Sequence, residues 1–202
     1  MNFEQNLYLE TDRVILRPLH LNDLPLLQTI AFNADTWRWT VTKIENQHEL
    51  ESWVNESITD RRKHSRYTFV MVDKATGNLA GSTAFSNISE KDKRLEIGWT
   101  WVSEACRGTG LNRHCKFLLL RYAFEELGYE RVELKTDVLN LRSRQAMRKI
   151  GATEEGILRS HTLMHDGRRR DTIFYSILHP EWPNLKATIF ADLSACVTQV
   201  SI

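Results

Sequence analysis

The part of the sequence best suited to chemistry is a basic, glycine-rich turn, Arg107-Gly108-Thr109-Gly110, which leads into an apolar-patterned run from Leu111. The first N–H groups of a helix lack intrahelical partners and carry a partial positive charge, so a helix N-terminus attracts anions. Glycines let the backbone approach an anion without an intervening Cβ, and Arg107 adds a positive charge. The pattern indicates a phosphate or other anion site, with an ordinary tight turn as the alternative.

Two common phosphate-binding motifs do not fit this turn. The P-loop pattern G-x-x-x-x-G-K-[ST] is absent from the sequence. The dinucleotide fingerprint G-x-G-x-x-G requires a third glycine where Arg113 stands. It also opens a repeated βαβ pattern, whereas the strands before this turn are predicted to form hairpins. The turn is therefore another class of anion site, or a turn without a ligand.

Metal and hydrolase chemistry find little support elsewhere in the chain. His161 and His165 are four residues apart, but they lie in or beside a predicted strand, where that spacing does not form a helical metal face. No H-E-x-x-H motif, Cys/His cluster or G-x-S-x-G elbow is present, so we predict no metal. Cys106, Cys115 and Cys196 form no C-x-x-C pair, which is typical of free thiols in a reducing cytoplasm.

The composition is that of an ordinary globular protein. A chain of 202 residues suits one domain, here expected over 1–182, followed by a helical tail over 183–202. A net charge of +1 disfavours nucleic acid as a partner, despite the basic runs RRKHSR at 61–66 and GRRRD at 167–171. No apolar run approaches the ~20 residues that span a bilayer, and the start has no signal-peptide pattern. We expect a cytoplasmic protein without a membrane partner.

The elements that must position the glycine turn follow the order β-α-α-β-β-β-α-β-α-β-β. Strands are predicted at 13–19, 67–73, 79–87, 93–102 and 130–138, with a final hairpin turning at 165–167. Helices are predicted at 21–34, 46–63, 109–127 and 140–151, and a loop at 34–40. This order predicts one α/β (α+β) domain with a central mixed, mostly antiparallel twisted sheet flanked by helices.

The strand before the turn, 93–102, presents different side chains on its two faces. Strict alternation places Ile97, Trp99 and Trp101 on one face, and Glu96, Gly98, Thr100 and Val102 on the other. The strand therefore brings one carboxylate close to the start of the turn.

Together these residues resemble a known family. The turn resembles the acetyl-CoA motif of the GNAT superfamily of N-acetyltransferases, [RQ]-x-x-G-x-[GA] after a strand, although Asn112 departs from the small residue in the last place. The stretches EIGW, N-L-R-S and R-K-I-G-A also match, and they resemble the branch of the RimJ- and RimL-type ribosomal-protein N-acetyltransferases. The resemblance covers about residues 8 to 180 and implies the GNAT fold, in which the two cofactor strands splay apart.

The resemblance implies that acetyl-CoA is the cosubstrate. The turn would hold the CoA diphosphate, the preceding strand would pair with the pantetheine arm, and the N-x-x-S residues would contact the cofactor. The cofactor-binding residues implied in this way are Thr100, Trp101, Val102, Arg107, Gly108, Thr109, Gly110, Leu111, Asn112, Asn140 and Ser143. The alternative for Asn140 and Ser143 is plain helix capping.

The resemblance also implies direct transfer, in which a neutral amine attacks the thioester carbonyl without a metal or a covalent enzyme intermediate. Glu96 is the first candidate for the general base, and a carboxylate paired with lysine or arginine on the sheet is its alternative. Ser143 is the candidate for protonating the departing thiolate. A base matters less for an α-amino group, which is roughly a tenth free base at pH 7, than for a lysine, which is below ~0.1%.

Trp37 and Trp39 fall in the region that helps to wall the acceptor site of this fold, or they fill the core. The acceptor is expected to be an amine, either a protein or peptide N-terminus or a small molecule. Helical spacing of Leu185, Ile189 and Leu193 allows packing on the same domain or a homodimer contact. A non-catalytic acyl-CoA-binding or sensing module on the same fold is the alternative function.

Overall fold

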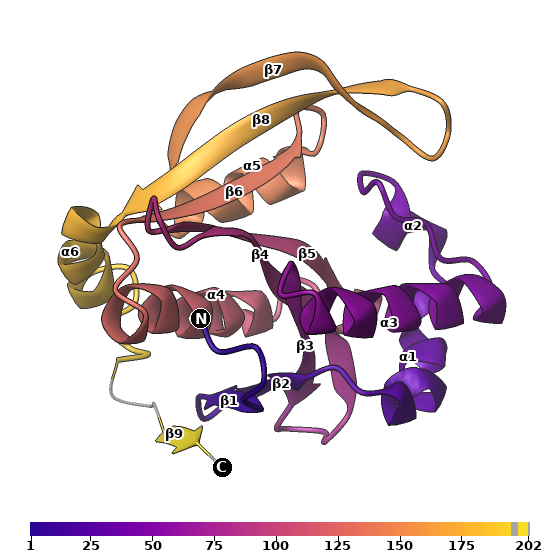
Figure 1. Cartoon of the computed structure of the whole chain (residues 1–202), viewed down its shortest axis with the longest axis horizontal. Helices are drawn as coiled ribbons and strands as arrows, with labels where there is room; N and C mark the ends of the chain where they lie inside the picture. Colours follow the sequence, from indigo (N-terminus) through magenta and orange to yellow (C-terminus); the bar gives the residue numbers. More distant parts are fainter. Residues whose placement is uncertain (195–197, 202) are drawn as a thin grey trace.

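The computed structural model describes residues 1–194 and 198–201 of the chain. Its described strands form one sheet in the order β7-β8-β6-β5-β4-β3-β2-β1-β9 (Figure 1). Every neighbouring pair is antiparallel except β5 and β6. The strands are β1 Leu7–Glu10, β2 Val14–Pro18, β3 Arg66–Asp73, β4 Leu79–Ser89, β5 Arg94–Val102, β6 Arg131–Asp137, β7 Thr153–Leu163, β8 Arg169–Leu178 and β9 Thr198–Ser201. The mixed, mostly antiparallel sheet predicted from the sequence is confirmed.

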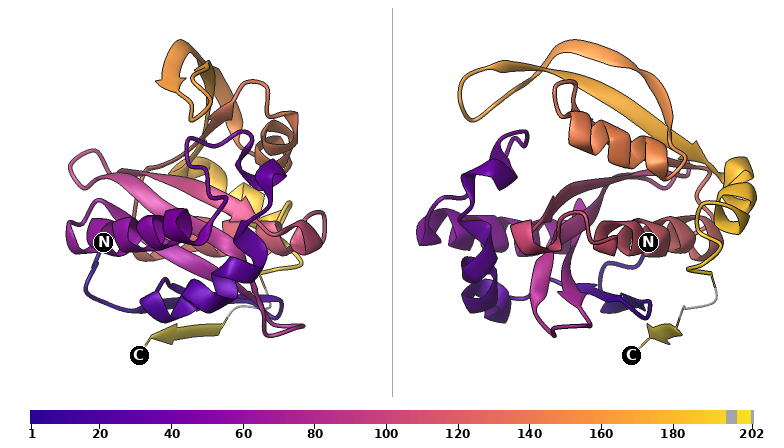
Figure 2. Two further views of the ribbon diagram at one scale, coloured as in Figure 1. Left: turned by 90° about the vertical axis from the view of Figure 1, so that its right-hand side faces the viewer. Right: turned by 180° about the vertical axis from the view of Figure 1, so that it is seen from behind.

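Helices cover both faces of this sheet (Figure 2). They are α1 Leu24–Ala31, α2 Ala34–Trp37, α3 Gln47–Arg62, α4 Leu111–Arg121, α5 Leu141–Lys149 and α6 Trp182–Ala187. The ends of these helices carry the expected residues. Asn46 and Asn140 each cap the start of a helix through their side chains, and Gly128 and Gly151 adopt positive φ after helical segments. None of the helices in the described residues is long and apolar enough to cross a membrane.

Two hydrophobic cores form, one on each face of the sheet. The larger contains the apolar face of α4, whose Leu111, Cys115 and Leu118 pack with buried strand residues. The smaller lies under α1 and α3 and is built around Trp37, Trp53, Trp101 and their aliphatic neighbours. Buried aliphatic and aromatic side chains of this size are the main favourable term in folding, so the sheet is held from both sides.

Three local features differ from the sequence-based expectations. Strand β1, which the alternation at 13–19 did not reveal, pairs with β2 on one side and β9 on the other. The expected loop at 34–40 begins with the short helix α2, capped by Asn33. The expected helical tail is helical only to Ala187, after which Leu193 still packs in the larger core of the same chain.

The β7–β8 hairpin forms a long arm that arches over α5 and reaches toward α2 (Figure 1). At its tip His165 Nε2 lies 3.3 Å from the carbonyl oxygen of Trp37. The predicted turn at 165–167 therefore closes over the region that carries the two tryptophans at 37 and 39.

Candidate active site

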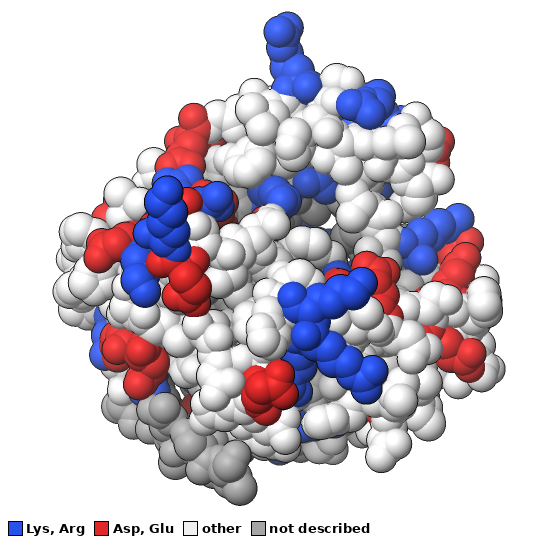
Figure 3. All heavy atoms as spheres, viewed as in Figure 1, with Lys and Arg blue, Asp and Glu red and all other residues white. Residues whose placement is uncertain are grey.

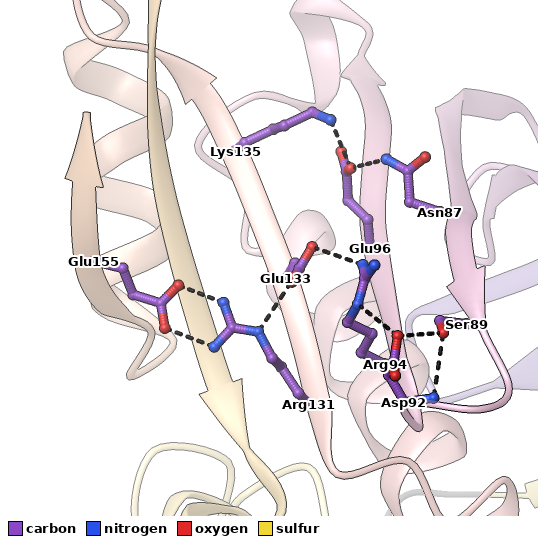
Figure 4. Close-up of polar contacts among 9 residues, drawn as sticks. All are labelled: Asn87, Ser89, Asp92, Arg94, Glu96, Arg131, Glu133, Lys135 and Glu155. Atoms are coloured by element: carbon purple, nitrogen blue, oxygen red, sulfur yellow. Dashed lines mark hydrogen bonds and ion pairs between the residues drawn. The ribbon is translucent and has the colours of Figure 1, made fainter. Parts of the chain in front are cut away.

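The main feature of the candidate site is the divergence of β5 and β6. Their pairing runs only from Arg94 opposite Arg131 to Glu96 opposite Glu133. Beyond that point the strands separate (Figure 4), so the edge of β5 that faces β6 has no partner strand among the described residues from Ile97 onward. An unpaired strand edge offers N–H and C=O groups to an extended ligand. The expected splay of these two strands is confirmed.

The glycine turn lies at the end of β5 and opens α4, as predicted. Gly108 and Gly110 have φ of 74° and 88°, a left-handed conformation that glycine adopts without steric cost. A Cβ built on either glycine meets no atom within 4 Å, so the turn borders open space. Within the described chain, no acceptor contacts the backbone N–H groups of Gly108, Thr109, Gly110 or Asn112. These groups can donate to an anion at the helix N-terminus.

The side chain of Arg107 points away from this set of donors and contacts α2. Its guanidinium donates to Asp35 Oδ2 at 3.2 Å and Thr36 Oγ1 at 2.6 Å, and its Nε donates to the carbonyl of Val102 at 3.2 Å. Arg107 therefore ties the turn to the segment that carries the tryptophans. The sequence placed Arg107 in the turn correctly but did not anticipate that Asp35 would pair with its charge.

A β-bulge in β5 overturns the expected alternation of its side chains. Ala84 lies opposite Gly98 and Ser82 opposite Trp101, so β5 contains one more residue than β4 over this interval. Trp99 adopts φ of 48° within the bulge. The extra residue reverses the facing of everything after it. Trp101 consequently packs in the smaller core, while Ile97 packs in the larger core, so the prediction that they share a face was wrong.

Glu96 lies at the point where the strands begin to separate, and it is 3% exposed. Its Oε2 accepts from Asn87 Nδ2 at 2.6 Å and lies 2.8 Å from Lys135 Nζ (Figure 4). Its Oε1 has no hydrogen-bond donor in the described structure and lies over Gly98, where an added Cβ would approach it to 2.7 Å. The ion pair on the sheet, which was the alternative for this residue, is present. The second oxygen stays available to another donor.

Lys116 is a polar residue of the site that sequence reasoning missed. It lies on α4, is 7% exposed, and its Nζ donates to Thr100 Oγ1 at 2.8 Å. Thr100 Oγ1 is in turn 2.8 Å from Thr83 Oγ1. Burial lowers the pKa of Lys116 to about 8, although the charge of Glu96 acts in the opposite direction. A lysine within the apolar run 115–120 was the available signal.

Asn140 and Ser143 lie where the sequence expected them, at the N-terminus of α5 and just beyond the end of β6. Asn140 Oδ1 accepts from the backbone N–H of Ser143 at 3.1 Å, which is the capping contact considered as the alternative. The Ser143 hydroxyl is half-buried and has no hydrogen-bond partner within the described chain, so capping leaves it available. Capping and ligand binding are compatible for this pair.

The two tryptophans after α1 have different surroundings. Trp37 is 3% exposed, donates from Nε1 to the carbonyl of Ala31 at 2.7 Å, and packs against Trp101. Trp39 is half-buried, and the guanidinium groups of Arg38 and Arg168 lie 4.9 and 5.9 Å from the centroid of its ring. Most of Trp37 is therefore packed in the core, although it also lines the pocket described below, and Trp39 is the more exposed of the two candidates for a wall.

The space near these residues is a hollow between the β7–β8 arm and the body of the protein (Figure 3). A pocket of about 360 Å³ at one end is lined by Ala34, Asp35, Trp37, Arg38, Lys43, Glu45, His165 and Asp166. In the described part of the chain, no group of three or more His, Cys, Asp or Glu side chains converges on a possible metal position. Cys196 lies outside the described residues.

Comparisons with known proteins agree with this architecture. The family model for the acetyltransferase (GNAT) domain matches residues 13–153. YdaF of Bacillus subtilis (strain 168), named as a proposed ribosomal N-acetyltransferase, is 34% identical over 158 residues, which cover 71% of this chain and 85% of YdaF. Spermidine N(1)-acetyltransferase of Escherichia coli (strain K12) is 28% identical over 170 residues, which cover 84% of this chain and 88% of that enzyme.

Solved structures show the same fold. The crystal structure of a proposed acetyltransferase from T. thermophilus matches with a TM-score of 0.84 and 30% identity, over 92% of this chain and 96% of that one. The divergence of β5 and β6, the glycine turn and the family match over most of the chain lead to the same conclusion. The protein belongs to the GNAT family of N-acetyltransferases, in its RimJ/RimL-like branch, as its sequence predicted.

Proposed function

We propose that this protein transfers an acetyl group from acetyl-CoA to a primary amine. The observation that carries the proposal is the separation of β5 and β6 beyond Glu96, directly before a turn with unpaired N–H groups. When bound, acetyl-CoA would supply the acetyl group as an activated thioester. Its diphosphate needs N–H donors and its arm is an extended chain with amide groups, so both parts fit the donors and the free strand edge described above.

Specific residues would hold each part of the cosubstrate. The backbone of the turn from Gly108 to Asn112 would bind the diphosphate, because its glycines leave space and its N–H groups, except that of Leu111, lack other acceptors in the described chain. The backbone of Thr100 to Val102 would pair with the arm. Asn140 and Ser143 would contact it from the other side of the gap, since they begin α5 after the end of β6.

Glu96 would accept a proton during the reaction, and Ser143 would donate one. Glu96 Oε1 is available to accept a proton from an amine, while Asn87 and Lys135 fix the carboxylate through Oε2. The Ser143 hydroxyl would supply the proton that the departing thiolate takes up. A water molecule in the gap could pass the proton between either side chain and its reaction partner, since general acid–base catalysis can act through one bridging water.

The acceptor is proposed to be a primary amine, either a protein or peptide N-terminus or a small amine. The name of YdaF supports a protein N-terminus, and that of the spermidine N(1)-acetyltransferase supports a small amine. An α-amino group needs less help from a base at neutral pH than an alkylamine does, because more of it is already neutral. The partly exposed Trp39 would contact the acceptor in the hollow.

The test is release of free CoA from acetyl-CoA by the purified protein. The panel contains N-terminal peptides, polyamines, aminoglycosides and amino acids, with a control that lacks acceptor. Release above the control, with a mass gain of one acetyl group on an acceptor, is the expected result. Tight acetyl-CoA binding without release on any acceptor would contradict the proposal and favour a binding module instead.

A further inference from the structure

Arg170 on β8 is a buried cation without an ion-pair partner. It is 7% exposed, and its Nε donates to Thr172 Oγ1 at 3.0 Å. Among the described residues, no carboxylate oxygen lies within 4.0 Å of its guanidinium nitrogens. An arginine is almost never this deeply buried unless it is paired, so this side chain is expected to bind an anion.

The two carboxylates whose charges act on Arg170 are already paired with other cations. Asp137, which is fully buried, accepts from Arg168 at 2.5 Å, and Glu96 pairs with Lys135 at 2.8 Å. Arg168 and Lys135 therefore take up these two carboxylates, which leaves the charge of Arg170 without an ion-pair partner in the described structure. Burial lowers the pKa of Arg170, and the charges of Asp137 and Glu96 offset this only partly while Arg168 adds to it.

The unpaired charge of Arg170 lies in the candidate acceptor region. Thr172 is opposite Asp137, at the end of β6 beyond the point of divergence, and Arg170 shares its face of β8 because strand side chains alternate. Arg168 connects the same cluster to Trp39. Basic side chains are visible in the hollow under the β7–β8 arm (Figure 3). The cluster therefore lies between Glu96 and the wall formed by Trp39.

We propose that the acceptor carries a carboxylate close to its reactive amine and that Arg170 binds this carboxylate, an inference that rests on the proposed amine acetylation. A guanidinium whose two terminal nitrogens lack protein partners matches a carboxylate through paired, charge-assisted hydrogen bonds. A polyamine would bring further positive charge next to the unpaired guanidinium of Arg170. Suitable acceptors are free amino acids and peptides with an acidic residue beside the N-terminus.

The test compares acceptors that differ only in this carboxylate. One pair is a free amino acid and its carboxamide, compared per neutral amine because the carboxylate raises the pKa of the amine beside it, and the other is an N-terminal peptide with Glu or Gln at its second position. We expect the carboxylate member of at least one pair to have a kcat/KM about tenfold to a hundredfold higher, the range for a hydrogen bond to a charged group. The pair that shows the preference identifies the source of the carboxylate.

The variant Arg170→Met should abolish that preference while the carboxamide acceptor is still acetylated. Arg170→Lys, which keeps the charge but loses the planar fork, should keep part of it. Arg169→Met is the matched control, because Arg169 is exposed on the opposite face and, within the described chain, its side chain forms hydrogen bonds only with Ser160. It removes the same charge and should leave the preference unchanged.

Two results would overturn the inference. The first is a wild-type enzyme that acetylates both members of each pair equally or prefers the carboxamide. The second is an Arg170→Met variant that retains the full carboxylate preference. If no acceptor in the panel is acetylated, the proposed function fails. The role of Arg170 is then tested separately, by calorimetry that measures how tightly each member of the same pairs binds to the CoA-bound protein. Preferential binding of the carboxylate member would then support the role of Arg170, and equal binding would refute it.

Discussion

Replacement of Lys116 with methionine is expected to stabilise the protein at neutral pH. The pKa of this buried ammonium is lowered to about 8 from an ordinary 10.5, a difference of about 2.5 units. Each unit corresponds to about 1.4 kcal/mol, so burial of the charged form costs the folded state about 3 kcal/mol. Methionine loses the hydrogen bond to Thr100, worth about 1 kcal/mol, and keeps the apolar stem. The expected gain in the free energy of unfolding at pH 7 is therefore about 2 kcal/mol.

The sign of the pH dependence follows from the same shift. Between pH 8 and 10.5 the unfolded chain binds more protons at Lys116 than the folded chain, so this residue makes stability rise with pH in that window. Its cost is fully present below pH 8 and disappears above 10.5. The advantage of Lys116→Met should therefore be greatest at pH 7, about half lost near pH 9 and gone near pH 10, above which the lost hydrogen bond to Thr100 leaves the variant slightly less stable.

The assay is urea denaturation followed by tryptophan fluorescence at pH 7, 8.5 and 10. The difference between wild type and variant is the quantity of interest, because other groups titrate in both proteins. Lys91→Met is the control, since Lys91 is exposed in the turn between β4 and β5. A Lys116→Met advantage that is absent at pH 7, or the same at every pH, would refute the reasoning.

Three further outcomes are expected. Glu96→Gln should lower turnover by about 10² or more and move the pH–rate profile to higher pH, since the amide accepts no proton; an unmoved profile removes Glu96 as the base. Ser143→Ala should reduce turnover more than acetyl-CoA affinity by calorimetry, whereas the reverse would make Ser143 a binding contact only. Burial raises the pKa of the Cys115 thiol to about 12, so a thiol reagent at pH 8 should modify Cys106 and spare Cys115 in peptide mapping of the folded protein. Modification of both at equal rates would contradict that burial.

The path of the chain around the glycine turn was predictable because its signals are local. Gly108 and Gly110 mark the turn, and the apolar spacing from Leu111 marks the helix, so strand, turn and helix follow from neighbouring residues. The Asn140 cap was predictable for the same reason. The elements that position the candidate cofactor site thus follow from short-range patterns.

The details of the gap were not predictable in this way. The bulge places Trp99, a bulky residue, at positive φ, and the side chains change face after it, which strict alternation does not predict even though Gly98 directly precedes it. β1 pairs with β9 across almost the whole chain, a contact without a local signal. Arg170 became a candidate only when the fold brought it near Asp137 and Glu96 and assigned their charges to other partners.

The central claim is that the glycine turn and the separated strands hold acetyl-CoA, and calorimetric titration of acetyl-CoA into wild type and Gly110→Trp tests it most directly. The space beside Gly110 is open, so an indole there would occupy it, although φ of 88° adds strain for any side chain. Circular dichroism of the variant should establish that it folds. We predict binding to wild type and none measurable to the folded variant. Equal affinity for both proteins would contradict the assignment of this turn.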